Sequence, residues 1–82
     1  MTKEEIKKIV DNFLVEELEI EEKKIVDEAL LKDDLGIDSL DFVDVVVIVE
    51  RYFGFKIKPE EMTNVATLIQ FYEYIESKQN AS

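Results

Sequence analysis

A single serine lies where the chain is best suited to chemical modification. Ser39 follows Gly36 in the run Leu35-Gly36-Ile37-Asp38-Ser39-Leu40, just before a segment with a helical pattern. The chain contains no Cys and no His, so the residues that most often activate a serine or bind a transition metal are missing. No lysine stands in an obvious pairing position with Ser39 either. We therefore expect chemistry to be done to Ser39 rather than by it, and we predict that the protein is not an enzyme.

The acids around this glycine resemble a calcium loop only superficially. An EF-hand loop needs oxygen ligands at alternating positions and a glutamate at the twelfth. Counted from Asp34, the alternating positions include Phe42, and the twelfth residue is Val45. We therefore predict no specific metal site.

The charge of the chain restricts its partners. It has 20 acidic and 10 basic residues, a formal net charge of −10, and residues 33–77 contain only Arg51, Lys56 and Lys58 as bases. Nucleic acids and anionic lipid surfaces repel such a chain, because Lys and Arg are needed to neutralise phosphate. We predict no nucleic-acid binding, no membrane insertion and steering toward basic protein surfaces. The alternative is that the charge only keeps a small protein in solution.

Length and composition indicate one small helical domain. The chain has 82 residues, 46% of them hydrophobic, and its two Gly and one Pro favour helices over many tight turns. Its charged start lacks the apolar stretch of a signal peptide, and no apolar run is long enough to span a membrane. We expect a cytoplasmic monomer with a single domain over residues 1–82, a core over about 3–76 and a frayed tail at 77–82.

The serine must be held by the segments on either side of it. Upstream, Thr2-Lys3-Glu4-Glu5 is a capping box that predicts a helix ending near Glu16 or Glu17. The apolar stripe of this helix comprises Ile6, Ile9, Val10, Phe13 and Leu14. Residues 18–38 have no sustained period and predict a long ordered loop with a short turn at 21–24. A loop of this length in a compact domain indicates a function.

The segment after the serine has two readings. Residues 45–49, Val-Val-Val-Ile-Val, form a β-branched run that propensity alone assigns to a buried strand. The flanks favour a helix, because Asp38 suits the N-cap, Asp41 suits the N3 position and Gly54 suits a left-handed stop. No second strand of similar quality exists to pair with the run. We therefore predict a helix from Ser39 to Phe53.

This helix has more apolar surface than one core face needs. At about 100° per residue, the predicted core face comprises Phe42, Val45, Val46, Val49, Tyr52 and Phe53. Leu40, Val43 and Val47 fall on a different arc, on the side of Ser39. Surplus apolar surface indicates either deep burial or a binding patch, and in a domain this small we favour the patch.

Two further elements complete the expected fold. Lys58-Pro59-Glu60-Glu61 predicts a short helical turn with proline near its start. Thr67-Leu68-Ile69-Gln70 is a second capping box, before a helix whose stripe comprises Leu68, Phe71, Tyr72 and Ile75. The sequence thus predicts an all-α fold, a small four-helix bundle of three main helices and one short helix, with a long loop between the first two helices.

The setting of the serine suits an anionic phosphodiester, because free N–H groups and the helix dipole favour phosphate at a helix start. Asp-Ser is also a common helix start, so this signal alone is weak. The wider pattern is more specific. It closely resembles the acyl carrier protein family over about residues 3–76, through Leu35-Gly36-Ile37-Asp38-Ser39-Leu40-Asp41, Val43-Asp44, Glu50, Phe53-Gly54, Ile57 and Glu60-Glu61.

The resemblance implies that Ser39 is the covalent attachment point for phosphopantetheine, donated from coenzyme A by a separate phosphopantetheinyl transferase. The thiol of that arm would carry acyl intermediates as thioesters between enzymes of fatty acid, polyketide or related lipid and secondary-metabolite biosynthesis. Residues 39–53 would be the recognition helix for acyl-loading, condensing and acyl-transfer enzymes with basic surface patches. The implied partner-binding residues are Asp38, Leu40, Asp41, Val43, Asp44, Val47, Glu50, Glu60 and Glu61.

Three departures from the usual family pattern leave the cargo open. Phe42 is bulky where a small residue is common, Arg51 interrupts the acidic run, and residues 43–49 are rich in Val and Ile. A specialised carrier of polyketide, lipid or other secondary metabolism is therefore at least as well supported as a housekeeping fatty-acid carrier. Other readings are an aminoacyl or peptidyl carrier, which usually has a second glycine where this chain has Ile37-Asp38, and an unmodified structural adaptor with the same fold.

Overall fold

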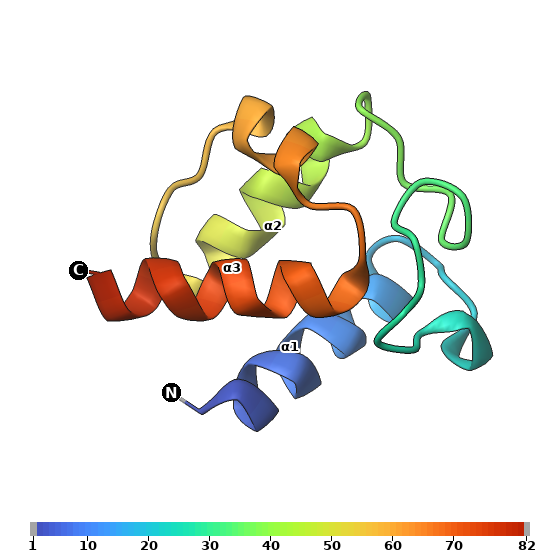
Figure 1. The fold of residues 1–82 in the computed structure, drawn as a ribbon, viewed down its shortest axis with the longest axis horizontal. Coiled ribbons are helices and arrows are strands. Elements are labelled where there is room, and N and C mark those ends of the chain that lie inside the picture. The colour runs from blue at the N-terminus through green and yellow to red at the C-terminus, as the bar shows by residue number, and fades with distance from the viewer. Residues whose placement is uncertain (1, 82) are drawn as a thin grey trace.

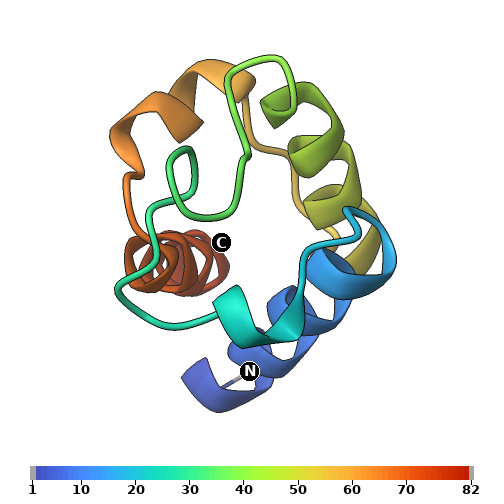
Figure 2. The same cartoon turned by 90° about the vertical axis from the view of Figure 1, so that its right-hand side faces the viewer.

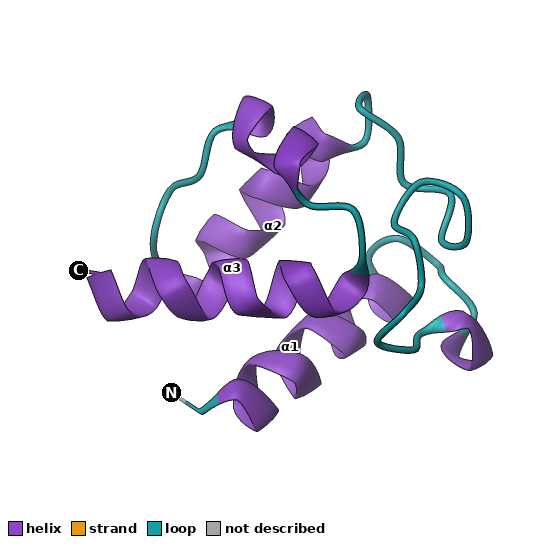
Figure 3. Ribbon diagram, in the orientation of Figure 1, coloured by secondary structure: helices purple, strands orange, loops and turns teal. Residues whose placement is uncertain are grey.

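The computed structural model describes residues 2–81 and confirms the all-α prediction (Figure 1). Loops join the helices, and the described residues contain no strand (Figure 3). The elements in chain order are α1 (Lys3–Glu16), the 3₁₀-helix η1 (Glu22–Lys24), α2 (Phe42–Phe53), the 3₁₀-helix η2 (Pro59–Asn64) and α3 (Leu68–Ala81). Over residues 2–81, no helix is long and apolar enough to cross a membrane.

The first helix begins where the sequence predicts. Thr2 Oγ1 accepts a hydrogen bond from the Glu5 N–H at 3.2 Å, and Glu5 Oε1 accepts one from the Thr2 N–H at 3.1 Å. The buried stripe of α1 faces α3, where the rings of Phe13 and Phe71 meet edge to face with centroids 6.5 Å apart. α1 passes below α3 in Figure 1, and α2 lies across the core from α3 in Figure 2.

The long loop between α1 and α2 is fixed to the start of α3. The Leu68 N–H donates to the Ala29 carbonyl at 2.9 Å, and the Ile69 N–H donates to the Asp27 carbonyl at 3.0 Å. These are N–H groups of the first turn of α3, which have no acceptor within their own helix. In return, the Leu31 N–H donates to the carbonyl of Ala66 at 3.0 Å. The backbone that leads to Ser39 is therefore held by hydrogen bonds, as an ordered loop must be.

The β-branched run is helical, as its flanks predicted. Its core face differs from the prediction, because Ile48 is also buried while Tyr52 is 39% exposed and Phe53 is only partly buried. The Tyr52 ring stacks on Phe13 at 5.7 Å, and its hydroxyl donates to Glu17 Oε2 at 3.3 Å. A tyrosine hydroxyl needs a polar partner, and this one finds it at the surface. Assigning Tyr52 to the core was therefore wrong.

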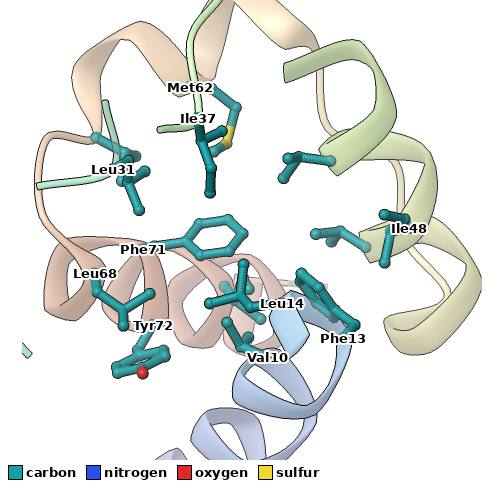
Figure 4. Close-up of a cluster of buried hydrophobic side chains, with 14 of the residues drawn as sticks. Val10, Phe13, Leu14, Leu31, Ile37, Ile48, Met62, Leu68, Phe71 and Tyr72 are labelled. Carbon is teal, nitrogen blue, oxygen red and sulfur yellow. The ribbon is translucent and has the colours of Figure 1, made fainter. Parts of the chain in front are cut away.

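The core lies between the three α-helices and the loop. Its members come from every α-helix, from η2 and from the loop, and Figure 4 shows Ile37 and Met62 beside each other above the ring of Phe71. Met62 and Ile37 are 1% and 4% exposed, although neither lies in an α-helix. The segments on either side of Ser39 are therefore anchored in the same core as the helices.

The last helix is longer than predicted. α3 continues to Ala81, so residues 77–81, which we expected to fray, belong to it, and residue 82 lies outside the described residues. Lys78 explains part of this extension. Its ammonium pairs with Glu61 Oε1 at 3.0 Å and lies 5.6 Å from the centre of the Tyr74 ring. These contacts fasten the end of α3 to η2.

Candidate functional site

Ser39 lies at the tip of a turn closed by two aspartates. Asp38 Oδ1 accepts hydrogen bonds from the N–H groups of Leu40 at 2.9 Å and Asp41 at 3.2 Å. Asp41 Oδ2 accepts one from the Asp38 N–H at 3.3 Å, and the Asp41 N–H donates to the Asp38 carbonyl at 3.0 Å. This reciprocal arrangement has the form of a capping box. It fixes the turn and leaves the Ser39 side chain exposed.

The turn corrects our expectation for the start of α2. The α-helix begins at Phe42 rather than at Ser39, because residues 38–41 form a tighter turn with an i to i+3 bond. Asp38 caps this turn, and Asp41, predicted at N3, takes the N-cap position of α2 without a side-chain capping bond. Asp38, which we predicted as an N-cap, accepts from the N–H groups of Leu40 and Asp41, so these two groups are not available to a phosphate. Ser39 remains the candidate attachment site because its side chain is exposed on a turn that hydrogen bonds hold in place.

The turn is anchored on both sides by buried residues. Gly36 has φ of +72°, a left-handed conformation that favours glycine, and it redirects the chain just before the turn. The next residue, Ile37, is buried, and its N–H donates to the Leu31 carbonyl at 2.7 Å. On the other side, Phe42 is also buried. Ser39 is thus presented between two anchors, and within residues 2–81 no other group hydrogen-bonds to its hydroxyl.

A cleft of about 440 Å³ opens beside Ser39. Its apolar lining comprises Leu30, Leu31, Ile37, Phe42, Met62, Val65 and Ala66. Polar residues that also line it include Asp33, Asp38, Ser39 and Thr63, all of them exposed. The sequence did not predict this cleft, because it forms where the long loop, the start of α2 and η2 come together. The only hint in the sequence was the apolar residues scattered along the loop.

The apolar patch predicted on α2 is exposed. Leu40, Val43 and Val47 are 83%, 54% and 51% exposed, so they contribute little to the core. Asp44 and Glu50 lie exposed on the same helix, and Glu60 lies exposed on η2. Among residues 2–81, none of these three acids takes part in a salt bridge. The structure therefore brings an apolar patch and unpaired carboxylates onto the elements that surround Ser39.

Two charged residues near this surface have partners inside the molecule. Glu61 accepts from the Lys58 N–H at 3.1 Å and pairs with Lys78. The pKa of Glu61 is lowered to about 2, first by the Lys58 N–H and then by Lys78 and the Tyr74 hydroxyl. Arg51, which interrupts the acidic run in the sequence, points its guanidinium at Glu17, with Nη1 3.2 Å from Oε2. The Glu61–Lys78 and Arg51–Glu17 ion pairs each join segments that are far apart in the sequence. The periodicity of one segment therefore could not predict them.

Comparison with known proteins agrees with this geometry. A family profile described as "Phosphopantetheine attachment site" matches residues 8–75. An acyl carrier protein of Thermotoga maritima is 39% identical over 77 residues, which cover 94% of this chain and 95% of that protein. An acyl carrier protein of Coprothermobacter proteolyticus is 36% identical over 77 residues, 94% of each chain. The chain belongs to the acyl carrier protein family, whose prosthetic group is phosphopantetheine.

The described residues fit such a group. An exposed hydroxyl on a fixed turn gives a transferase access to one oxygen, and the adjoining cleft can receive part of an attached arm. When attached, phosphopantetheine supplies a thiol that holds an acyl group as a thioester. The family thus makes this protein a carrier of acyl groups.

Proposed function

We propose that Ser39 carries the phosphopantetheine arm and that the protein passes acyl thioesters between partner enzymes. The observation that carries the proposal is the Asp38–Asp41 turn, which holds Ser39 exposed with its hydroxyl unengaged inside the region matched by the family profile. The hydroxyl oxygen would form a bond to the pantetheine-side phosphorus of coenzyme A and lose its proton. The pyrophosphate P–O bond of coenzyme A would break, and adenosine 3′,5′-bisphosphate would leave. The chain has no His to accept that proton, and the carboxylates of Asp38 and Asp41 already accept backbone hydrogen bonds, so we assign the base to the transferase.

Partner enzymes would contact the surface around Ser39. The proposed contact residues are Asp38, Leu40, Asp41, Val43, Asp44, Val47, Glu50 and Glu60, which combine apolar side chains with carboxylates. Exposed ion pairs contribute about 0–1 kcal/mol each, so contacts built on them release readily. Their main effect is on the rate of encounter with basic surfaces. Glu61 has a smaller part in this proposal than the sequence predicted, because Lys78 already neutralises it.

Intact-mass spectrometry tests the attachment. The purified protein is incubated with coenzyme A and a phosphopantetheinyl transferase, alongside the variants Ser39→Ala and Ser77→Ala. We expect wild type and Ser77→Ala to gain the mass of one phosphopantetheine, because Ser77 lies on α3 away from the cleft lining. Ser39→Ala should gain nothing while keeping a wild-type circular dichroism spectrum, since none of the hydrogen bonds that close the turn involves the Ser39 side chain. Loading of Ser39→Ala at the wild-type rate would refute the proposal.

A further inference from the structure

The cleft beside Ser39 has a polar rim and an apolar floor. The polar lining residues are exposed, whereas Leu31, Ile37, Phe42, Met62 and Val65 are all buried and belong to the hydrophobic core. An acyl group on an arm anchored at Ser39 can return to this cleft, since its own attachment point lies in the lining. The cleft volume of about 440 Å³ lies within the range of about 300–1,000 Å³ typical of ligand pockets.

The residue that limits this cleft along α2 is Phe42. It is the first residue of α2 and 9% exposed, and it both belongs to the hydrophobic core and lines the cleft. The next residues on the same helical face, at i+3 and i+4, are the smaller Val45 and Val46, both buried. A shorter side chain at position 42 would therefore extend the cleft along α2 toward these valines.

The other residues of the floor are less suited to set its depth. Met62 has a flexible, unbranched side chain that adapts to what it contacts. Ile37 and Leu31 lie on the loop, and the bond from the Ile37 N–H to the Leu31 carbonyl holds their backbone. Phe42 combines a rigid ring with a backbone fixed in a helix.

We infer that Phe42 determines the length of acyl chain that the protein shields from solvent. The inference rests on the proposed attachment at Ser39. With Phe42 in place, the cleft takes the end of the arm with a short acyl group, and a long saturated chain stays exposed until a partner enzyme binds it. Removing the ring opens space for further methylenes. Each methylene that becomes shielded shifts the equilibrium between shielded and exposed cargo by about fourfold.

Cleavage of the thioester by hydroxylamine reports this shielding. Wild type, Phe42→Ala, Phe42→Leu and the control Val26→Ala are loaded with acetyl- or octanoyl-phosphopantetheine from the corresponding coenzyme A thioesters. Intact mass confirms one arm per chain, and circular dichroism confirms the fold. Val26 is a matched control because it is 48% exposed on the loop and does not line the cleft.

We expect wild type and Val26→Ala to release acetyl groups more slowly than octanoyl groups, because their cleft shields only the short chain. Phe42→Ala should slow octanoyl cleavage by about fourfold or more and leave acetyl cleavage unchanged. Phe42→Leu should lie between them, and it decides the question if Phe42→Ala does not fold. The inference about Phe42 would be wrong if wild type already protected its octanoyl group. It would also be wrong if a folded Phe42 variant released octanoyl at the wild-type rate. Either result would leave the proposed attachment at Ser39 intact. Failure of wild type to load would overturn the proposed function as well.

Discussion

Acidic side chains serve two different purposes in two regions of this small domain. In the region of α1, α3 and the loop, several carboxylates are paired with cations or hydroxyl groups of other segments. Lys7 Nζ lies 3.5 Å from Asp11 Oδ2 and 3.2 Å from Asp27 Oδ1, and the Tyr72 hydroxyl donates a short hydrogen bond to Asp11. Around Ser39, in contrast, Asp44, Glu50 and Glu60 have no salt bridge within residues 2–81, although they are exposed in a similarly acidic chain.

The comparison shows that negative charge alone does not identify a binding surface. Asp11 joins α1 to α3, and Asp27 joins the loop to α1, so these carboxylates contribute to the fold. Within residues 2–81, Asp44, Glu50 and Glu60 pair with no cation, and they leave a negative field beside the Leu40, Val43 and Val47 patch. Glu61 is one of the paired acids, because it contacts Lys78, although its neighbour Glu60 is one of the unpaired acids.

The largest effect should come from reversing the unpaired charges. In the double variant Asp44→Lys/Glu50→Lys, the second-order rate of loading by a phosphopantetheinyl transferase at low salt should fall about tenfold or more, because electrostatic steering is lost. The difference from wild type should shrink as salt is added, since exposed charges are screened over about 10 Å at 0.1 M ionic strength.

Glu22→Lys is the control for this experiment, because Glu22 is an exposed acid on η1 and does not line the cleft. It should leave the rate within about twofold of wild type, as expected for a charge outside the docking surface. Equal losses in both variants would mean that total charge, rather than the surface around Ser39, attracts the transferase.

A smaller effect, on stability, should separate a paired acid from an unpaired one. Asp11→Ala removes the acceptor of the buried Tyr72 hydroxyl and should lower the free energy of unfolding by about 1–3 kcal/mol. Glu50→Ala should change it by less than about 0.5 kcal/mol, as is usual for exposed residues without partners. Urea denaturation of the two variants measures both values. Similar losses would show that the two groups of acids do not differ as described.

The smallest effect concerns acid unfolding. Glu61 has a pKa of about 2 in the folded protein against 4.5 ordinarily, so the folded state binds protons less readily than the unfolded state. Its contribution to stability is therefore complete above pH 4.5 and is lost as the pH falls toward 2. As the pH falls from 4.5 toward 2, the free energy of unfolding of Glu61→Gln should decrease less than that of wild type. The neighbouring variant Glu60→Gln should show the same decrease as wild type. A Glu61→Gln profile parallel to that of wild type would contradict the pairing with Lys78.

Local signals in the sequence predicted much of this structure. The capping boxes at Thr2 and Thr67 and the stop at Gly54 act within a few residues, and each helix end that they predicted is present. The flanks of residues 45–49 outweighed their strand propensity, because a lone strand has no partner to complete its hydrogen bonds. Ser39 could be proposed as the attachment site for the same reason, as its signal lies in adjacent residues.

The features that the sequence did not predict depend on contacts between distant segments or on which hydrogen-bond partner a side chain has. Asp38 and Asp41 bond to each other's backbone, and this tight turn delays the start of α2 to Phe42. Tyr52 lies at the surface because its hydroxyl reaches Glu17 across the bundle. The cleft exists only where the loop, α2 and η2 meet. None of these features follows from the periodicity of a single segment.

Peptide mapping of the loaded protein tests the assignment of Ser39 most directly. Trypsin cuts after Lys32 and Arg51 and releases residues 33–51, in which Ser39 is the only hydroxyl-bearing side chain. After loading from coenzyme A, the mass of phosphopantetheine should appear on this peptide and on no other. Its appearance on a peptide that contains another serine, threonine or tyrosine, with residues 33–51 unmodified, would contradict the assignment.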